Sequence, residues 1–146
     1  MLAIAQFVAA FATSVFAGAA IYINLVEHPA RMGCPTSVAA MVWAPSYERA
    51  TLMQAPLAIV GSVFGVLAWR LGAGTAWLVA SGLIFVVVPF TLVVIMATNK
   101  QLLAPGRDLA SPETRSLLVK WGRLHAVRSA LSLAASAIML WQLVKT

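Results

Sequence analysis

Two short polar clusters interrupt an otherwise apolar chain, and their residue types could carry out acid–base chemistry. The first cluster covers residues 27–31 and 43–49, and the second covers residues 98–99 and 121–128. Both histidines of the chain fall within these clusters. If the protein catalyses a reaction, we expect the reaction here.

His125 is the candidate base. Trp121, His125 and Arg128 are spaced i, i+4 and i+7, so they share one face of a helix. A histidine titrates near neutral pH, and a neighbouring arginine stabilises the anion that remains when a proton is removed. We place Arg128 and Arg49 as anion stabilisers, and we expect Arg49 and His125 to line one pocket because both begin membrane helices from the same side.

Trp121 and three further residues are candidates for binding a substrate. Asn99 and Tyr47 could donate hydrogen bonds to a carbonyl or enolate oxygen, and Glu27 could orient a histidine or pair with an arginine. The alternative is structural, since ionisable residues at membrane boundaries commonly anchor the helix or pair with one another. For the charged candidates both interpretations stay open.

We expect no metal and no cofactor. The single cysteine, Cys34, rules out an intrachain disulfide and a CxxC motif. A metal bound through Glu27, His28 and His125 is the minority alternative, because the two histidines do not show the spacing of a metal motif. The chain also lacks the glycine-rich and nucleophile motifs of nucleotide-binding proteins and hydrolases.

Composition places the chain in a membrane. Of its 146 residues, 62% are hydrophobic and 10% are charged, and the mean hydropathy is +0.92. Soluble domains carry about 25% charged residues. Four apolar stretches approach or reach the roughly 20 residues that cross a bilayer as a helix, and they cover residues 2–26, 53–69, 75–97 and 126–144. The sequence therefore predicts an all-α protein, a single domain over 1–146 built as a four-helix transmembrane bundle.

Local signals refine this bundle. Residues 70–74 predict a tight hairpin, and Ser111-Pro112 predicts that the last helix starts well before the membrane. Pro45 favours a second helix starting near Ser46, which leaves residues 32–42 as a short amphipathic or re-entrant segment. Pro89 should kink the third span. Three tryptophans are predicted to lie in interfacial belts, namely Trp69, Trp77 and Trp141.

Basic residues predict the orientation. Seven lysines and arginines fall between the first and second spans or between the third and fourth, against two on the opposite side. We therefore expect a multi-pass protein of the cell (inner) membrane with cytoplasmic basic loops and both termini outside. The net charge of +6 is explained by these loops, so we expect no nucleic-acid partner. The expected partners are membrane lipid and a hydrophobic small molecule, and self-association into a homo-oligomer is left open.

The polar clusters also carry a family resemblance. Residues 18–31 contain Tyr22, Asn24 and the run Glu27-His28-Pro29, and residues 43–54 contain the string Trp-x-Pro-Ser-Tyr-x-Arg. Residues 98–102 and 121–128 supply two further blocks in the same order. These four blocks resemble the anthrone-oxygenase-like integral membrane family, much of which has been classed as a domain of unknown function.

The resemblance implies a small four-helix membrane protein and a link to the cofactor-free oxygenation of anthrones by dioxygen. It adds Tyr22 to the candidate site. Our functional hypothesis is an oxidoreductase-like protein that acts on a hydrophobic aromatic, phenolic or quinone-type molecule. The alternative is a non-enzymatic membrane protein that binds a lipophilic ligand or a protein partner.

Overall fold

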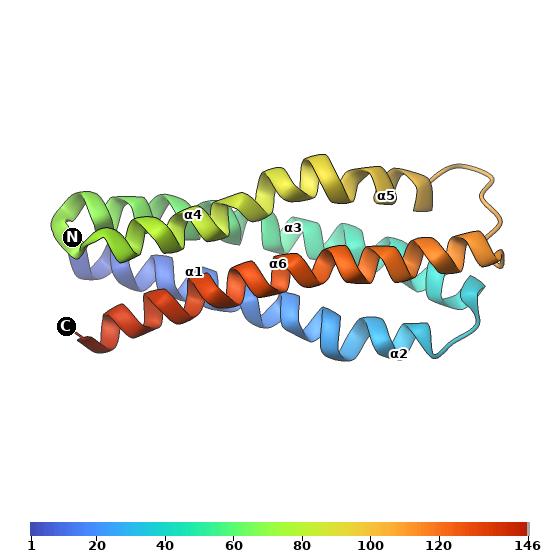
Figure 1. The fold of residues 1–146 in the computed structure, drawn as a ribbon, viewed down its shortest axis with the longest axis horizontal. Helices are drawn as coiled ribbons and strands as arrows, with labels where there is room; N and C mark the ends of the chain where they lie inside the picture. Colours follow the sequence, from blue (N-terminus) through green and yellow to red (C-terminus); the bar gives the residue numbers. More distant parts are fainter. Residues whose placement is uncertain (146) are drawn as a thin grey trace.

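Four long helices lie side by side along the longest axis of the molecule, with both chain ends at the same end of the bundle (Figure 1). The structure is a computed structural model and describes residues 1–145. Each long helix is long and apolar enough to cross a membrane, and the four run over Leu2–Met32, Thr36–Ala73, Thr75–Leu102 and Pro112–Lys145. The all-α fold with four candidate spans is therefore confirmed.

Shorter elements divide the long helices. In chain order the elements are α1 (Leu2–Tyr22), η1 (Ile23–Glu27), α2 (His28–Met32), α3 (Thr36–Ala68), η2 (Trp69–Ala73), α4 (Thr75–Phe90), η3 (Thr91–Ile95), α5 (Met96–Leu102) and α6 (Pro112–Lys145). The elements η1 and η3 are single π-helical turns, whereas η2 contains the kink at Gly72, where φ is +96°. The turn after α2 and the loop between α5 and α6 lie together at the end opposite the termini (Figure 1).

Two predicted boundaries are confirmed. Helix α6 begins at Pro112, where the Ser111 hydroxyl accepts a hydrogen bond from the Thr114 backbone N–H at 3.1 Å. The hairpin between α3 and α4 turns at Gly72 and Gly74, whose φ angles are +96° and +91°. Glycine suits both positions because it has no Cβ to oppose a positive φ.

The re-entrant segment predicted for residues 32–42 is absent. Instead α3 begins at Thr36 and continues through Pro45, and only residues 33–35 form the turn. Pro35 stands in an extended conformation with ψ 147°, so it ends the turn and starts the helix. Pro45 is accommodated inside α3, as prolines often are in membrane helices. The first helix correspondingly continues past Val26 to Met32.

Two π-helical turns interrupt long helices in their polar halves. In η1 the backbone N–H of His28 bonds to the Ile23 carbonyl, five residues earlier. In η3, after Pro89, Met96 bonds in the same way to Thr91, and the Thr91 hydroxyl donates to the Val87 carbonyl at 2.7 Å. Such turns insert one extra residue per turn and often occur at functional sites. The turn η1 carries Asn24, whose contacts are described below.

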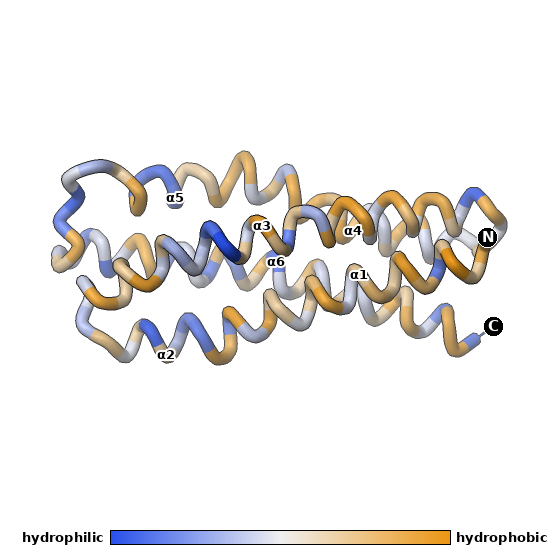
Figure 2. The backbone as a smooth tube through the Cα atoms, turned by 180° about the vertical axis from the view of Figure 1, so that it is seen from behind, coloured by the Kyte–Doolittle hydropathy of each residue, from blue (hydrophilic) through white to orange (hydrophobic). Residues whose placement is uncertain are grey.

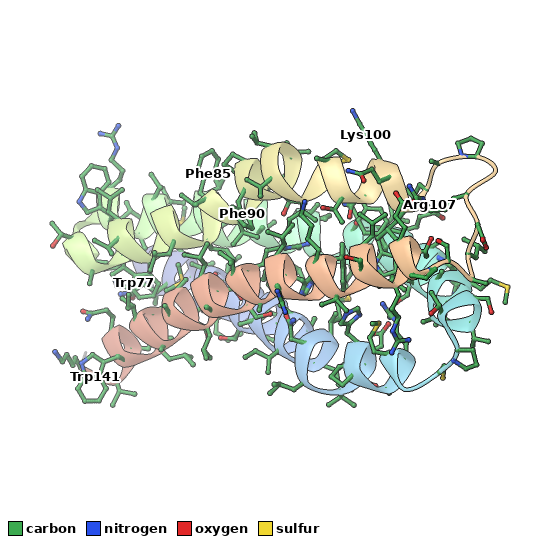
Figure 3. All side chains as sticks on the ribbon, turned by 45° about the vertical axis from the view of Figure 1, so that its right-hand side comes forward. Trp77, Phe85, Phe90, Lys100, Arg107 and Trp141 are labelled. Carbon is green, nitrogen blue, oxygen red and sulfur yellow. The ribbon has the colours of Figure 1, made fainter. Side chains whose placement is uncertain are left out.

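The interior changes character along the bundle axis. Hydrophilic residues concentrate in the half that holds α2 and α5, and the half near the termini is mostly hydrophobic (Figure 2). Small residues allow close packing in the apolar half, where a Cβ on Gly61 would come within 3.0 Å of the Thr13 side chain. The prediction of an interfacial Trp77 is wrong, because Trp77 is buried in the core of that half. Trp141 is exposed and points away from the bundle (Figure 3).

Candidate functional site

A small polar cavity lies between the helices in the polar half of the bundle. Its volume is about 10 Å³, the scale of a single water molecule. Its walls come from four helical segments, η1, α2, α3 and α6. The residues that line the polar cavity are Ile23, Arg31, Ser46, Tyr47, Ala50, Thr51, Gln54, Trp121, His125 and Arg128.

His125 is held by a hydrogen-bonded group from two helices. The His125 side chain is 1% exposed, and its Nδ1 lies 2.7 Å from the Asn24 side-chain oxygen. The same oxygen accepts a hydrogen bond from the Ser129 hydroxyl at 2.5 Å. The Asn24 amide nitrogen donates to the Gly122 carbonyl at 3.0 Å. Within residues 1–145 the other ring nitrogen of His125, Nε2, makes no protein hydrogen bond.

Aromatic rings fix the orientation of this histidine. The Trp121 ring packs against His125 with 4.8 Å between ring centroids and against His28 with 5.2 Å. Trp43 meets Trp121 edge-on at 5.8 Å and stacks on Tyr47 at 5.2 Å. Edge-to-face and offset aromatic pairs each add about 0.5–1.5 kcal/mol beyond area burial. This aromatic cluster forms a stiff wall beside the polar cavity.

Two arginines reach the cavity from different helices. Arg128 donates a hydrogen bond to the Gln54 side-chain oxygen at 2.8 Å, and its guanidinium lies 5.5 Å from the centre of the Phe16 ring. Arg31 forms an ion pair with Glu27 and also bonds to the Ser46 hydroxyl, which itself donates to Glu27. Arg31 therefore has a compensating carboxylate, whereas Arg128 has only a neutral partner.

Several buried donors around the cavity have no acceptor in the protein. They are Gln54 Nε2, Arg31 Nε and Arg128 Nε. Leaving a buried donor unpaired costs about 1–3 kcal/mol, and more when the group is charged. Three such donors on residues that line one water-sized cavity make it a suitable place for an oxygen atom that carries negative charge.

The structure brings some of the predicted site residues together and leaves others apart. His125, Arg128, Tyr47 and Trp121 line the polar cavity, and Glu27 acts on it through Arg31. Arg49 is exposed and lines a separate open groove with Tyr22, so it does not share the cavity of His125 as expected. The extra length of the first helix brings Arg31 into the cavity wall in its place.

Asn99 is buried elsewhere in the polar half. Its side chain is 0% exposed, it is absent from the cavity wall, and neither its amide nitrogen nor its amide oxygen has a partner within residues 1–145. No three His, Cys, Asp or Glu side chains of the described residues gather as a metal site, so Glu27, His28 and His125 do not form one.

Sequence reasoning missed three residues of the site. Asn24, Arg31 and Gln54 make the contacts described above, yet none was selected as a candidate. A signal was present for Asn24 and Gln54, because a polar side chain within an apolar helix is costly unless it faces a partner. Gln54 and Asn24 are the polar residues nearest to the site within their apolar stretches.

A second hollow opens beside the polar cavity and is mostly apolar. This apolar chamber has a volume of about 100 Å³. It shares Tyr47, Thr51 and Arg128 with the polar cavity. Its other walls are Phe16, Ala55, Ala58, Val87, Val88, Thr91, Leu92 and Met96. Exposed residues such as Ala55 and Leu92 form its rim, so the apolar chamber opens on the apolar surface of the bundle.

Four apolar helices around a buried histidine and arginine site define a small helical protein of the membrane type. The chain belongs to the anthrone oxygenase family, which it matches over residues 43–138. It is similar to the anthrone oxygenase tpcL of Aspergillus fumigatus, with 36% identity over 77 residues, or 51% of this chain and 48% of that protein. The match therefore spans about half the length of this relative. No solved structure matches the chain.

Proposed function

We propose that the protein is a membrane oxygenase that oxidises an anthrone-type aromatic ketone to a quinone with dioxygen. His125 acts as the base, and Arg128, Arg31 and Gln54 stabilise the resulting anion. The observation that carries this proposal is the set of unpartnered buried donors on residues that line the same water-sized cavity as the histidine. Membership of the anthrone oxygenase family supports the substrate class.

The first step is proton removal. An anthrone has a CH₂ group opposite its ketone, and loss of one of these protons leaves an enolate whose charge rests on the ketone oxygen. His125 receives the proton at Nε2, the ring nitrogen that makes no hydrogen bond within residues 1–145. Donors already fixed in place stabilise such an oxyanion, because they need no reorganisation when the charge develops. Arg128 and Gln54 are fixed in this way by their mutual hydrogen bond.

The remaining steps balance without a further reductant. The electron-rich carbon of the enolate reacts with dioxygen to form a C–O bond, and the peroxide so formed takes a proton to become a hydroperoxide. Loss of the second C–H proton together with hydroxide breaks the O–O bond and gives the new ketone. In total, CH₂ and O₂ become C=O and H₂O, and the substrate supplies all four electrons.

The apolar chamber suits the ring system. The polar cavity has room for a group the size of one water molecule, so a polycyclic ring system must lie outside it. The chamber is walled by Phe16 and aliphatic side chains and adjoins Arg128. A ketone oxygen placed near Arg128 leaves the rings in the chamber, and the CH₂ group can reach His125 only when the two hollows are joined, because His125 lines the polar cavity alone. Movement of Tyr47, which lies between the two hollows, would join them.

We also propose that the polar end of the bundle faces the cytoplasm, in the cell (inner) membrane. This proposal rests on the excess of lysine and arginine at that end.

The test is turnover of an anthrone by the purified protein in lipid nanodiscs, with the spontaneous oxidation rate in empty nanodiscs subtracted. With ¹⁸O₂ we expect one labelled oxygen in the quinone and one O₂ consumed per molecule. His125→Gln should lower turnover about 100-fold or more, within the usual range for loss of a general base. Ser14→Ala, which removes a hydrogen bond to Ser136 outside both hollows, is the matched control. Tight anthrone binding without oxygen consumption would instead identify a binding protein.

A further inference from the structure

We infer that Asn24 is a positioning residue that fixes the proton of neutral His125 on Nδ1, so that Nε2 is the free base at the polar cavity. The role of this tautomer in turnover rests on the proposed function, but the tautomer itself does not. A neutral histidine carries its proton on one of two nitrogens, and only the other nitrogen can accept a proton. The partner of Nδ1 therefore decides which nitrogen can act.

The orientation of the Asn24 amide is set by the backbone of α6. Its nitrogen lies 3.0 Å from the Gly122 carbonyl oxygen, which can only accept a hydrogen bond. A rotated amide would put two oxygen atoms against each other. The amide nitrogen must therefore face Gly122, and the amide oxygen must face His125 and Ser129.

The Asn24 oxygen then dictates the histidine tautomer. An amide oxygen has no proton to give, so His125 Nδ1, at 2.7 Å, must be the donor. The Ser129 hydroxyl donates to the same oxygen at 2.5 Å, and its distance to the His125 carbonyl is much longer at 3.4 Å. Both lone pairs of the Asn24 oxygen are thereby occupied, which holds the oxygen in place.

The surroundings prevent this arrangement from relaxing. Asn24 lies in the π-helical turn η1, where the extra residue of the turn directs it toward α6. A Cβ on Gly122 would come within 2.6 Å of the His28 ring, so a glycine is needed for the helices to approach this closely. Trp121 covers the His125 ring at 4.8 Å and opposes its rotation.

The test reads the tautomer directly. Protein labelled with ¹⁵N on its histidine rings is measured by NMR in nanodiscs without substrate, above the pH at which the ring becomes neutral. Signals that disappear in His125→Gln belong to His125. We expect a protonated Nδ1 and an unprotonated Nε2 in the wild type. Asn24→Leu, which keeps the size but removes all three side-chain hydrogen bonds of Asn24, should shift the proton toward Nε2, the usual site in free histidine. Ser14→Ala, which breaks the hydrogen bond between α1 and α6 at Ser136, should leave the wild-type pattern.

Activity provides the second measurement. Asn24→Leu should lower turnover about 10- to 100-fold, as removal of an orienting partner commonly does, with little change in KM. Asn24→Asp keeps an acceptor for Nδ1 and should retain the Nδ1–H tautomer. A wild-type His125 protonated on Nε2 would overturn the inference, even if Asn24→Leu fails to fold. A wild type with the Nδ1–H tautomer that oxidises no anthrone would overturn the proposed function and leave the inference standing.

Discussion

The guanidinium of Arg128 on α6 lies 2.8 Å from the side-chain oxygen of Gln54 on α3, and this hydrogen bond spans the polar cavity. The neutral amide of Gln54 thus accepts a hydrogen bond from the buried cationic guanidinium of Arg128. A carboxylate in the place of Gln54 would neutralise Arg128 and would remove its attraction for the proposed enolate intermediate. The neutral amide thus keeps the cavity positively charged, and its own nitrogen adds a donor with no partner in the described part of the chain.

Gln54 variants should separate stability from activity. Gln54→Leu leaves the Arg128 guanidinium without its acceptor and should lower the free energy of unfolding by about 1–3 kcal/mol. Gln54→Glu retains the acceptor and should unfold at the wild-type temperature or above. Its turnover should nevertheless fall at least tenfold, because the carboxylate opposes the developing negative charge. Thermal unfolding followed by tryptophan fluorescence, together with the oxygenation assay, tests both. A fully active Gln54→Glu would contradict the anionic intermediate.

Gly122→Ala should destabilise the polar half. The added Cβ would come within 2.6 Å of the His28 ring, which is buried and cannot move away without leaving Trp121. Overpacking of this kind costs about 1–3 kcal/mol. Gly82→Ala in α4 is the matched control, because a Cβ there meets nothing within 4 Å. Equal unfolding temperatures for the two variants would show that α2 and α6 do not approach this closely at Gly122.

Arg31 and Arg49 differ in their position relative to His125. Arg31 is buried in the wall of the polar cavity, and Arg49 is exposed on the neighbouring groove. Arg31→Gln should therefore reduce turnover more than Arg49→Gln, since water screens the charge of an exposed residue. Steady-state kinetics in nanodiscs gives the comparison. A larger loss in Arg49→Gln would restore Arg49 to the role expected from its position at the start of a membrane helix.

Cys34 offers a test of membrane orientation. It is exposed in the turn between α2 and α3, at the polar end of the bundle. If this end is cytoplasmic, a membrane-impermeant maleimide should label Cys34 in permeabilised cells but not in whole cells. A variant carrying Cys34→Ser and Leu71→Cys, with the thiol in the opposite hairpin, should be labelled in whole cells. The reverse pattern would invert the proposed topology.

Apolar length and local capping predicted most of the fold. The start of α6 at Pro112 and the glycine hairpin near Gly72 follow from local chemistry that few alternatives satisfy. The start of α3 was misplaced because two prolines, Pro35 and Pro45, could each begin a helix. Only Pro35 does so, and nothing local distinguishes them in a membrane helix that tolerates proline. Trp77 was wrongly assigned to the interface because the neighbouring helices bury it, and the sequence does not show which helices are neighbours.

The candidate site was predicted only in part, and the reason is geometric. Helical spacing correctly grouped Trp121, His125 and Arg128, because they share one helix. Contacts between helices depend on which way each side chain points around the helix axis. The π-helical turn η1 changes this direction for the residues within and after it. Asn24 and Arg31 lie within or beyond that turn, so their direction could not be read from a regular helical period.

The opening of the apolar chamber on the apolar surface of the bundle has a consequence for the kinetics of the proposed reaction. A substrate that enters from the bilayer is presented at its mole fraction among lipids, not at its concentration in water. For the proposed oxygenase reaction, added lipid should dilute a fixed amount of substrate and slow the reaction, although the aqueous composition is unchanged. Apparent Michaelis constants would then be properties of the bilayer as much as of the protein. Dioxygen, which dissolves better in hydrocarbon than in water, would reach the same opening already concentrated.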